Sequence, residues 1–126
     1  KISGKQIITA LENGVSQVEQ VAGRFPQVAG IRFAWNPQAL PGHRIVSVEI
    51  KTGNGYQLMD PSAIYGVATN DFLAGGGDGY TVFQKAVNIY NSGLADFEIL
   101  QDHIKANSPL RPELEGRIQV SRTSFN

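Results

Sequence analysis

Apolar residues follow a helical spacing at the start of this chain and an alternating spacing immediately afterwards. In residues 3–23 the apolar positions recur every three or four residues, which predicts an amphipathic helix with Ser3 as N-cap and Gly23 as C-cap. Strands are predicted next, over residues 25–35, 43–51 and 64–69. Because no helical pattern separates these strands, the chain lacks the βαβ alternation of a parallel sheet.

Helical patterns return in the C-terminal third of the chain. Residues 81–91 and 94–108 each predict a helix, and residues 115–122 predict a last strand. Thr52 to Gly55 has the composition of a hairpin turn, and Asp60–Pro61 marks another turn. The order α-β-β-β-α-α-β predicts an α+β fold, in which a mixed β-sheet is flanked by helices.

Length and composition indicate a single globular domain over residues 1–126. Apolar residues make up 41% and charged residues 17%, the formal net charge is zero, and there is no cysteine. The sequence has no basic cluster of the kind that binds nucleic acid and no apolar run long enough to span a membrane. The chain begins with Lys1 and opens directly on a helix, so we expect it to be a fragment or a processed form.

Residues 69–80 read TNDFLAGGGDGY and place three consecutive glycines between an aromatic ring and a carboxylate. A phosphate-binding P-loop is excluded because the first lysine after these glycines is Lys85, inside a predicted helix. A dinucleotide fingerprint is disfavoured because Tyr80 stands where a small residue belongs. A calcium loop is disfavoured because no oxygen-rich residue lies between Asp71 and Asp78.

Two interpretations of the glycine stretch remain open. In the structural one, the glycines form a tight turn and Asp78 caps the helix that starts near Thr81. In the functional one, the glycines let a flat ligand lie against the backbone. Phe72, at the end of a strand, then stacks on a nucleobase, and Asp78 accepts hydrogen bonds from a ribose diol.

The same residues resemble a known family signature. YGVATNDFLAGGGDGY resembles the pattern Y-x-V-x-x-x-x-F-x-A-x-G-G-D-G-[YF] from the C-terminal domain of the 5'-nucleotidase family, which includes UDP-sugar hydrolases and 2',3'-cyclic-nucleotide phosphodiesterases. The resemblance extends to ISGKQIITALENGV, to GRFPQVAGIRFAWNPQALPGHRIVSVEI and to EGRIQV, in the family's order. It covers essentially the whole chain.

The resemblance implies a role for six residues in holding the nucleoside part of a nucleotide. Phe72 matches one of two aromatics that sandwich the base, and Asp78 matches the aspartate that binds the ribose hydroxyls. Gly75, Gly76 and Gly77 match the glycines that shape the pocket, and Gly23 matches a glycine near the base. The other stacking aromatic and the substrate-binding arginines of the family would lie before Lys1, so the domain is expected to be N-terminally truncated.

Catalysis in this family belongs to an N-terminal metallophosphatase domain with two divalent metal ions. The resemblance therefore implies a hydrolase of nucleotide phosphate esters whose catalytic residues and metal ligands lie outside this chain, and an extracytoplasmic location. The chain alone is expected to be inactive and to need no cofactor of its own. Within the family, a thiosulfate-pathway hydrolase is an alternative. A free-standing ligand-binding module is the alternative from a different class.

Other candidate residues are interpreted as structural. His43 and His103 are the chain's only histidines and are expected to be solvated, because no pattern places metal ligands or a nucleophile beside either. Trp35 is expected in the core or an interface, and Arg32 and Arg44 at the surface. Apolar area and a sheet edge left uncovered by the truncation predict self-association.

Overall fold

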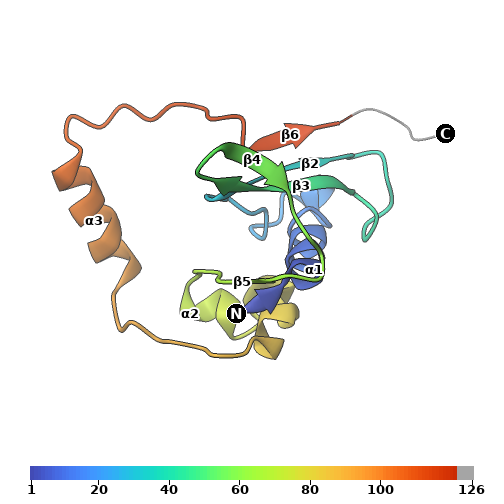
Figure 1. Ribbon diagram of the computed structural model, residues 1–126, viewed down its shortest axis with the longest axis horizontal. Coiled ribbons are helices and arrows are strands. Elements are labelled where there is room, and N and C mark those ends of the chain that lie inside the picture. The colour runs from blue at the N-terminus through green and yellow to red at the C-terminus, as the bar shows by residue number, and fades with distance from the viewer. Residues whose placement is uncertain (122–126) are drawn as a thin grey trace.

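A four-stranded mixed sheet forms the centre of the computed structural model, which describes residues 1–121 (Figure 1). Its strands lie in the order β4-β3-β2-β6, with antiparallel pairing between β4, β3 and β2, whereas β6 runs parallel to β2. The strands are β2 (Ile31–Trp35), β3 (Ile45–Thr52), β4 (Gly55–Leu58) and β6 (Ile118–Val120). Together with the helices, this arrangement confirms the α+β class and the mixed sheet.

Helix α1 (Gly4–Gly14) begins at the predicted residue but ends earlier than predicted. Ser3 and Gln6 form a reciprocal capping box, in which the Ser3 amide donates to Gln6 Oε1 at 2.7 Å and the Gln6 amide donates to Ser3 Oγ at 3.2 Å. The prediction of a C-cap at Gly23 is wrong, because α1 ends at Gly14 and a 3₁₀ helix (Val18–Gln20) follows.

Helix α1 ends at Gly14, where Pro26 and Tyr80 pack closely against the backbone. A Cβ atom there would lie 2.7 Å from Pro26 Cδ and 2.7 Å from the Tyr80 hydroxyl. The sequence shows no sign of either neighbour, since both are distant along the chain.

The main core forms where α1 packs on the sheet. Ile7, Leu11 and Val15 of this N-terminal segment are buried against the inner face of β2 and β3, which presents Phe33, Trp35 and Val48. Trp35 is 5% exposed, which confirms its expected place in the core. Phe33 sits at the centre of the sheet because it pairs with Val48 on one side and Ile118 on the other.

Arg44 is buried, so the expectation that it lies at the surface is wrong. Its guanidinium donates to the Val15 carbonyl at 2.7 Å and to the Ala39 carbonyl at 2.9 Å, and it pairs with Glu19, whose pKa this hydrogen bond lowers. A buried guanidinium is tolerated here because acceptors surround it. Arg32 remains partly exposed and pairs with Glu49, as expected for a surface arginine.

Several predicted elements are shorter in the structure, and others, including β1 (Ile2–Ser3), β4 and α2 (Asp71–Ala74), were missed. The third strand is reduced to β5 (Ile64–Tyr65), which pairs with β1 in a separate two-stranded sheet. Strand β4 and the short helix α2 lie in stretches that were expected to be a connector and a loop. The hairpin turn before β4 is nevertheless the one predicted, since Thr52 pairs with Gly55.

The helix predicted over residues 81–91 is wrong beyond its first turn. A 3₁₀ helix covers Thr81–Lys85, and Ala86 is extended, with ψ of 145°. The amide of Val87 donates to the Lys1 carbonyl at 3.0 Å, so a partner distant in sequence replaces the helical hydrogen bond.

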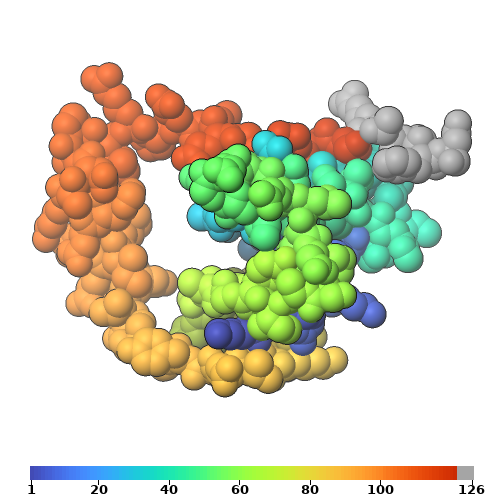
Figure 2. All heavy atoms as spheres, viewed as in Figure 1, coloured from blue at the N-terminus to red at the C-terminus, as the bar shows by residue number. Residues whose placement is uncertain are grey.

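Residues 86–117 form an arm that extends away from the rest of the domain, and the chain returns to it as β6 (Figure 1). The arm carries α3 (Asp96–Ala106), which confirms the second predicted helix, while the predicted end of the last strand at Arg122 lies outside the described residues. Open space separates the arm from the rest of the domain (Figure 2). Its large apolar side chains are exposed: Val87, Ile89, Tyr90, Leu94, Phe97, Ile99, Leu100, Ile104, Leu110 and Leu114.

These exposed side chains predict self-association through the arm. Burying apolar surface contributes about 25 cal/mol per Å², so two arms that cover each other are stabilised. Light scattering over a concentration series should show species larger than a monomer. The double variant Phe97→Asp, Leu100→Asp should shift the distribution toward monomer, and Leu40→Asp, at a still more exposed leucine outside the arm, should not. A monomer at every concentration of the unmodified chain would contradict the prediction.

Candidate functional site

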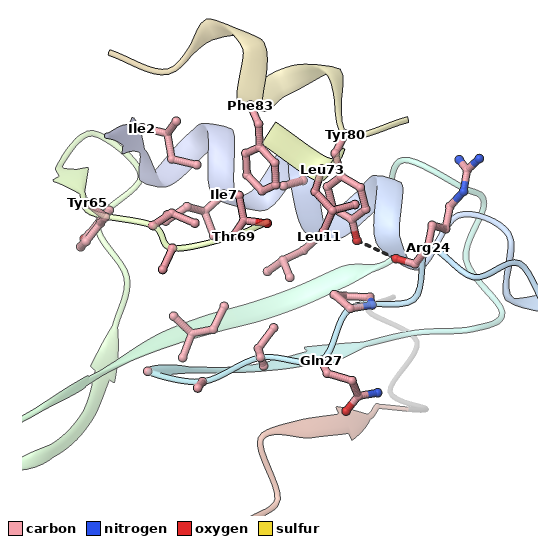
Figure 3. A pocket seen from close by; sticks show the side chains of 18 of the residues that line it. Ile2, Ile7, Leu11, Arg24, Gln27, Tyr65, Thr69, Leu73, Tyr80 and Phe83 are labelled. Carbon is pink, nitrogen blue, oxygen red and sulfur yellow. Dashed lines mark hydrogen bonds between the residues drawn. The ribbon is translucent and has the colours of Figure 1, made fainter. Parts of the chain in front are cut away.

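A cavity of about 780 Å³ lies between α1 and the strands β2 and β3 (Figure 3). Ile7 and Leu11 point into it from α1, and Ile31 and Ile50 line it from the sheet. Its volume is in the range of small-molecule sites, and its lining is mostly apolar.

Two segments distant in sequence meet at one end of the cavity and contribute polar residues to its lining. Gly23 and Arg24 come from the loop after α1, and Asp78 and Tyr80 come from the glycine stretch. The cavity thus brings together Gly23 and Asp78, two of the six predicted site residues. Phe72, Gly75, Gly76 and Gly77 are not part of its lining.

Phe72 lies in helix α2 and not at the end of a strand, which corrects the expectation for this residue. The helix forms because Asn70 caps it: Asn70 Oδ1 accepts from the Leu73 amide at 2.9 Å. Phe72 is 58% exposed, so much of its surface is open to a ligand.

The Phe72 ring lies directly over Gly77. A Cβ atom at Gly77 would be 2.6 Å from Cε2 and Cζ of the ring, closer than real side-chain contacts. Gly77 is therefore required for this ring position. Since Gly77 precedes Asp78, the ring and the segment that carries the carboxylate are held next to each other.

Gly75 and Gly76 have other structural roles. Gly76 has φ of 91°, a left-handed conformation that favours glycine, and the Gln84 side chain covers it. Gly75 ends α2 with an ordinary φ of −77°, and its carbonyl accepts from Gln84 Nε2 at 2.8 Å. In this structure Phe72 and Gln84 therefore occupy the space above Gly77 and Gly76.

Asp78 is held through its backbone, and its side chain is left available. Its φ of 53° is left-handed, and its carbonyl accepts from Asn13 Nδ2 at 3.0 Å. Within residues 1–121 its carboxylate forms no hydrogen bond or salt bridge. One part of the structural interpretation, in which Asp78 caps the following helix, is wrong, because neither the 3₁₀ helix Gly77–Gly79 nor the one over Thr81–Lys85 has a side-chain cap.

Asn13, Arg24 and Tyr80 complete this end of the site, and the sequence did not single them out. Arg24 Nη1 donates to Asn13 Oδ1 at 3.1 Å, and the Tyr80 hydroxyl donates to the Arg24 carbonyl at 2.6 Å, the bond drawn in Figure 3. No spacing rule links these residues, because the contacts join α1, the following loop and the glycine stretch.

Tyr80 anchors the end of the glycine stretch to the interior. It is 4% exposed and stacks on Phe83, with 5.4 Å between the ring centroids. Burial raises the pKa of the Tyr80 hydroxyl, the charge of Asp78 adds to that rise, and the charge of Arg24 opposes it. The hydroxyl therefore stays protonated and serves as a hydrogen-bond donor.

Metal ligands are not gathered anywhere in residues 1–121. No group of three or more His, Cys, Asp or Glu side chains in this part of the chain is arranged to hold a metal ion. These residues do not fit the two metal ions that the family resemblance implies. A separate finding is that the described residues include no helix long and apolar enough to cross a membrane.

Comparison with known proteins gives a consistent result. The family described as "5'-nucleotidase, C-terminal domain" matches residues 1–85. The chain is 42% identical over 120 residues to the trifunctional nucleotide phosphoesterase protein YfkN of Bacillus subtilis (strain 168), covering 94% of this chain and 8% of that protein.

Two solved structures share the fold. A 5'-nucleotidase precursor from Thermus thermophilus superimposes with a TM-score of 0.93 and 44% identity, over 98% of this chain and 24% of that one. The NAD nucleotidase of Haemophilus influenzae gives a TM-score of 0.78 and 28% identity, over 96% of this chain and 23% of that one. The chain therefore spans less than a quarter of the length of each of these three relatives.

The buried Tyr80 hydroxyl predicts a stability difference that depends on pH. Tyr80→Phe should lower the free energy of unfolding near neutral pH by about 1 kcal/mol, the net contribution of a typical hydrogen bond. The unfolded chain loses the tyrosine proton near the usual pKa of 10, whereas the folded chain holds it to higher pH. Stability of the unmodified chain should therefore fall above about pH 10 relative to the variant.

Urea unfolding at several pH values measures this difference. Tyr90→Phe is the matched control, since Tyr90 is 87% exposed and should behave like the unmodified chain at every pH. Equal stability of Tyr80→Phe and the unmodified chain near neutral pH would contradict the role given to the hydroxyl.

Proposed function

The chain belongs to the 5'-nucleotidase C-terminal domain family, and on this premise we propose that it binds the nucleoside part of a nucleotide whose phosphate ester is hydrolysed. The observation that carries the proposal is that the exposed Phe72 ring packs against Gly77, one residue before Asp78, whose carboxylate is unpaired within residues 1–121. The two groups differ in chemistry, and a nucleoside offers a partner for each.

Asp78 is suited to a vicinal diol. An ionised carboxylate has two acceptor oxygens and no donor, so it can accept a hydrogen bond from each of two neighbouring hydroxyls. Hydrogen bonds to charged groups contribute about 1.5–3 kcal/mol each. Because the backbone of Asp78 is already held by Asn13, little conformational entropy remains to be lost when a ribose binds.

Phe72 is suited to the base. Its ring packs against Gly77, and the exposed part of the residue can meet a planar ligand. Stacking of a nucleobase on an aromatic side chain contributes about 1–3 kcal/mol and tolerates different bases. The glycines support this arrangement indirectly, through the position of the ring and the turn to Asp78.

The hydrolytic chemistry is assigned to another part of the polypeptide. We propose an N-terminal metallophosphatase domain whose two divalent metal ions activate water, and an extracytoplasmic location, as the family resemblance implies. The names of the relatives, a nucleotide phosphoesterase and a 5'-nucleotidase precursor, support a phosphoester substrate. The chain itself contributes binding and specificity.

Nucleoside binding can be measured on this chain by NMR titration with adenosine and 2',3'-dideoxyadenosine. Asp78→Asn should weaken adenosine binding about 10-fold or more, because a charged acceptor is lost, and should leave the dideoxy compound unchanged, because it has no diol. Phe72→Ala should weaken both nucleosides to a similar degree, by about 5-fold or more.

Asp71→Asn is the matched control, since it makes the same change of charge on a neighbouring exposed aspartate. It should not change the preference for adenosine. If Asp78→Asn weakens both nucleosides equally, or neither, the diol assignment is wrong and a different ligand must be sought.

A second prediction is that the chain alone does not hydrolyse nucleotides. Incubated with AMP and a divalent metal ion, it should release no more phosphate than a sample without protein, because residues 1–121 contain no metal-ligand cluster. Phosphate release that disappears when a residue of this chain is substituted would overturn the assignment of catalysis to another domain.

A further inference from the structure

We infer that Asn13 and Arg24 are positioning residues for Asp78, and that they determine the preference for a ribose diol without touching the ligand themselves. The inference rests on the proposed function. It comes from the hydrogen bonds that join Asn13, Arg24 and Asp78 across three separate segments of the chain.

The conformation of Asp78 needs an external restraint. Asp78 and Gly79 both have positive φ, 53° and 80°, and a left-handed conformation is unfavourable for a residue with a Cβ atom. Asp78 is exposed, so packing does not hold it. The restraint is the hydrogen bond from Asn13 Nδ2 to the Asp78 carbonyl, at 3.0 Å.

Arg24 determines which end of the Asn13 amide faces Asp78. A guanidinium can only donate, so the amide end that faces Arg24 Nη1 at 3.1 Å must be the oxygen. The amide nitrogen then points to the Asp78 carbonyl, which can only accept. A flipped amide would place donor against donor and acceptor against acceptor, so Arg24 and Asp78 fix the orientation together.

Two further contacts close the arrangement. The Tyr80 hydroxyl donates to the Arg24 carbonyl at 2.6 Å, which ties the loop after α1 to the residue two positions after Asp78. A Cβ atom at Gly79 would lie 2.6 Å from Asn13 Oδ1, so the glycine lets the backbone approach the amide. The direction of the Asp78 carboxylate is therefore determined by residues of three segments.

Phe72 is positioned by different contacts. Its ring is positioned by α2 and by Gly77, neither of which touches Asn13 or Arg24 in the contacts described above. Loss of Asn13 or Arg24 should therefore impair recognition of the sugar and spare stacking of the base. If Asn13 and Arg24 had only a structural role, their loss would weaken sugar recognition and base stacking together.

The test is a titration of this chain with adenosine and 2',3'-dideoxyadenosine. Arg24→Met removes the donors and keeps much of the side-chain length, and Asn13→Asp keeps the acceptor for Arg24 but removes the donor to Asp78. Each should weaken adenosine binding about 3- to 10-fold and leave the dideoxy compound unchanged. Arg24→Lys, which keeps a donor and the charge, should restore most of the preference.

Arg32→Met is the matched control, because Arg32 is also a partly exposed arginine paired with a side chain, and it lies on the sheet. It should bind both nucleosides like the unmodified chain. NMR spectra of every variant report whether it is folded, and Asn13→Asp provides a second, independent route if Arg24→Met is not.

A double variant separates positioning from direct binding. If Arg24 acts through Asp78, Arg24→Met should have no further effect on adenosine binding in the Asp78→Asn background. An additive loss would overturn the inference, as would retention of the adenosine preference in both Arg24→Met and Asn13→Asp. If Asp78→Asn weakens both nucleosides equally, or neither, the proposed function fails, and the inference fails with it. If only Asp78→Asn shows the effect, the inference alone fails.

Discussion

Helix α1 is buried on two faces, and the rest of the structure is placed by those two contacts. On one face Ile7 and Leu11 pack on the sheet, and on the other Ala10 packs with Tyr80 and Val82. Gly14 allows Tyr80 to approach the end of the helix. Because α1 contacts both the sheet and the segment that contains Tyr80, it fixes the position of the glycine stretch relative to the sheet.

The same arrangement links stability to binding. The buried Tyr80 ring anchors the end of the glycine stretch to the interior, while Asp78, two residues earlier, stays exposed with an unfavourable φ. Strained residues persist only where the surroundings over-determine them, and here Asn13 provides the restraint. A carboxylate that is held through its backbone and unpaired within residues 1–121 is what a diol-binding site requires.

Much of the fold could be predicted from local patterns. Ser3 identified the start of α1, the alternation of Phe33 and Trp35 identified β2, and the turn before Gly55 identified a hairpin. Gly23 and Asp78 were singled out from the sequence and do line one cavity. Phe72 was placed on the wrong element, because a cap at Asn70 starts a helix of a single turn that periodicity cannot detect.

The sequence by itself determined the order of the elements, the α+β class and the segment that carries the candidate site, because capping, alternation and glycine content act over a few residues. The tertiary structure decided where α1 ends, why the helix predicted over residues 81–91 stops after Lys85, and which residues hold Asp78. Each depends on a partner distant along the chain: Pro26 for Gly14, Lys1 for Val87 and Asn13 for Asp78. No local pattern encodes such a contact, since it exists only once the packing of α1 has brought the two segments together.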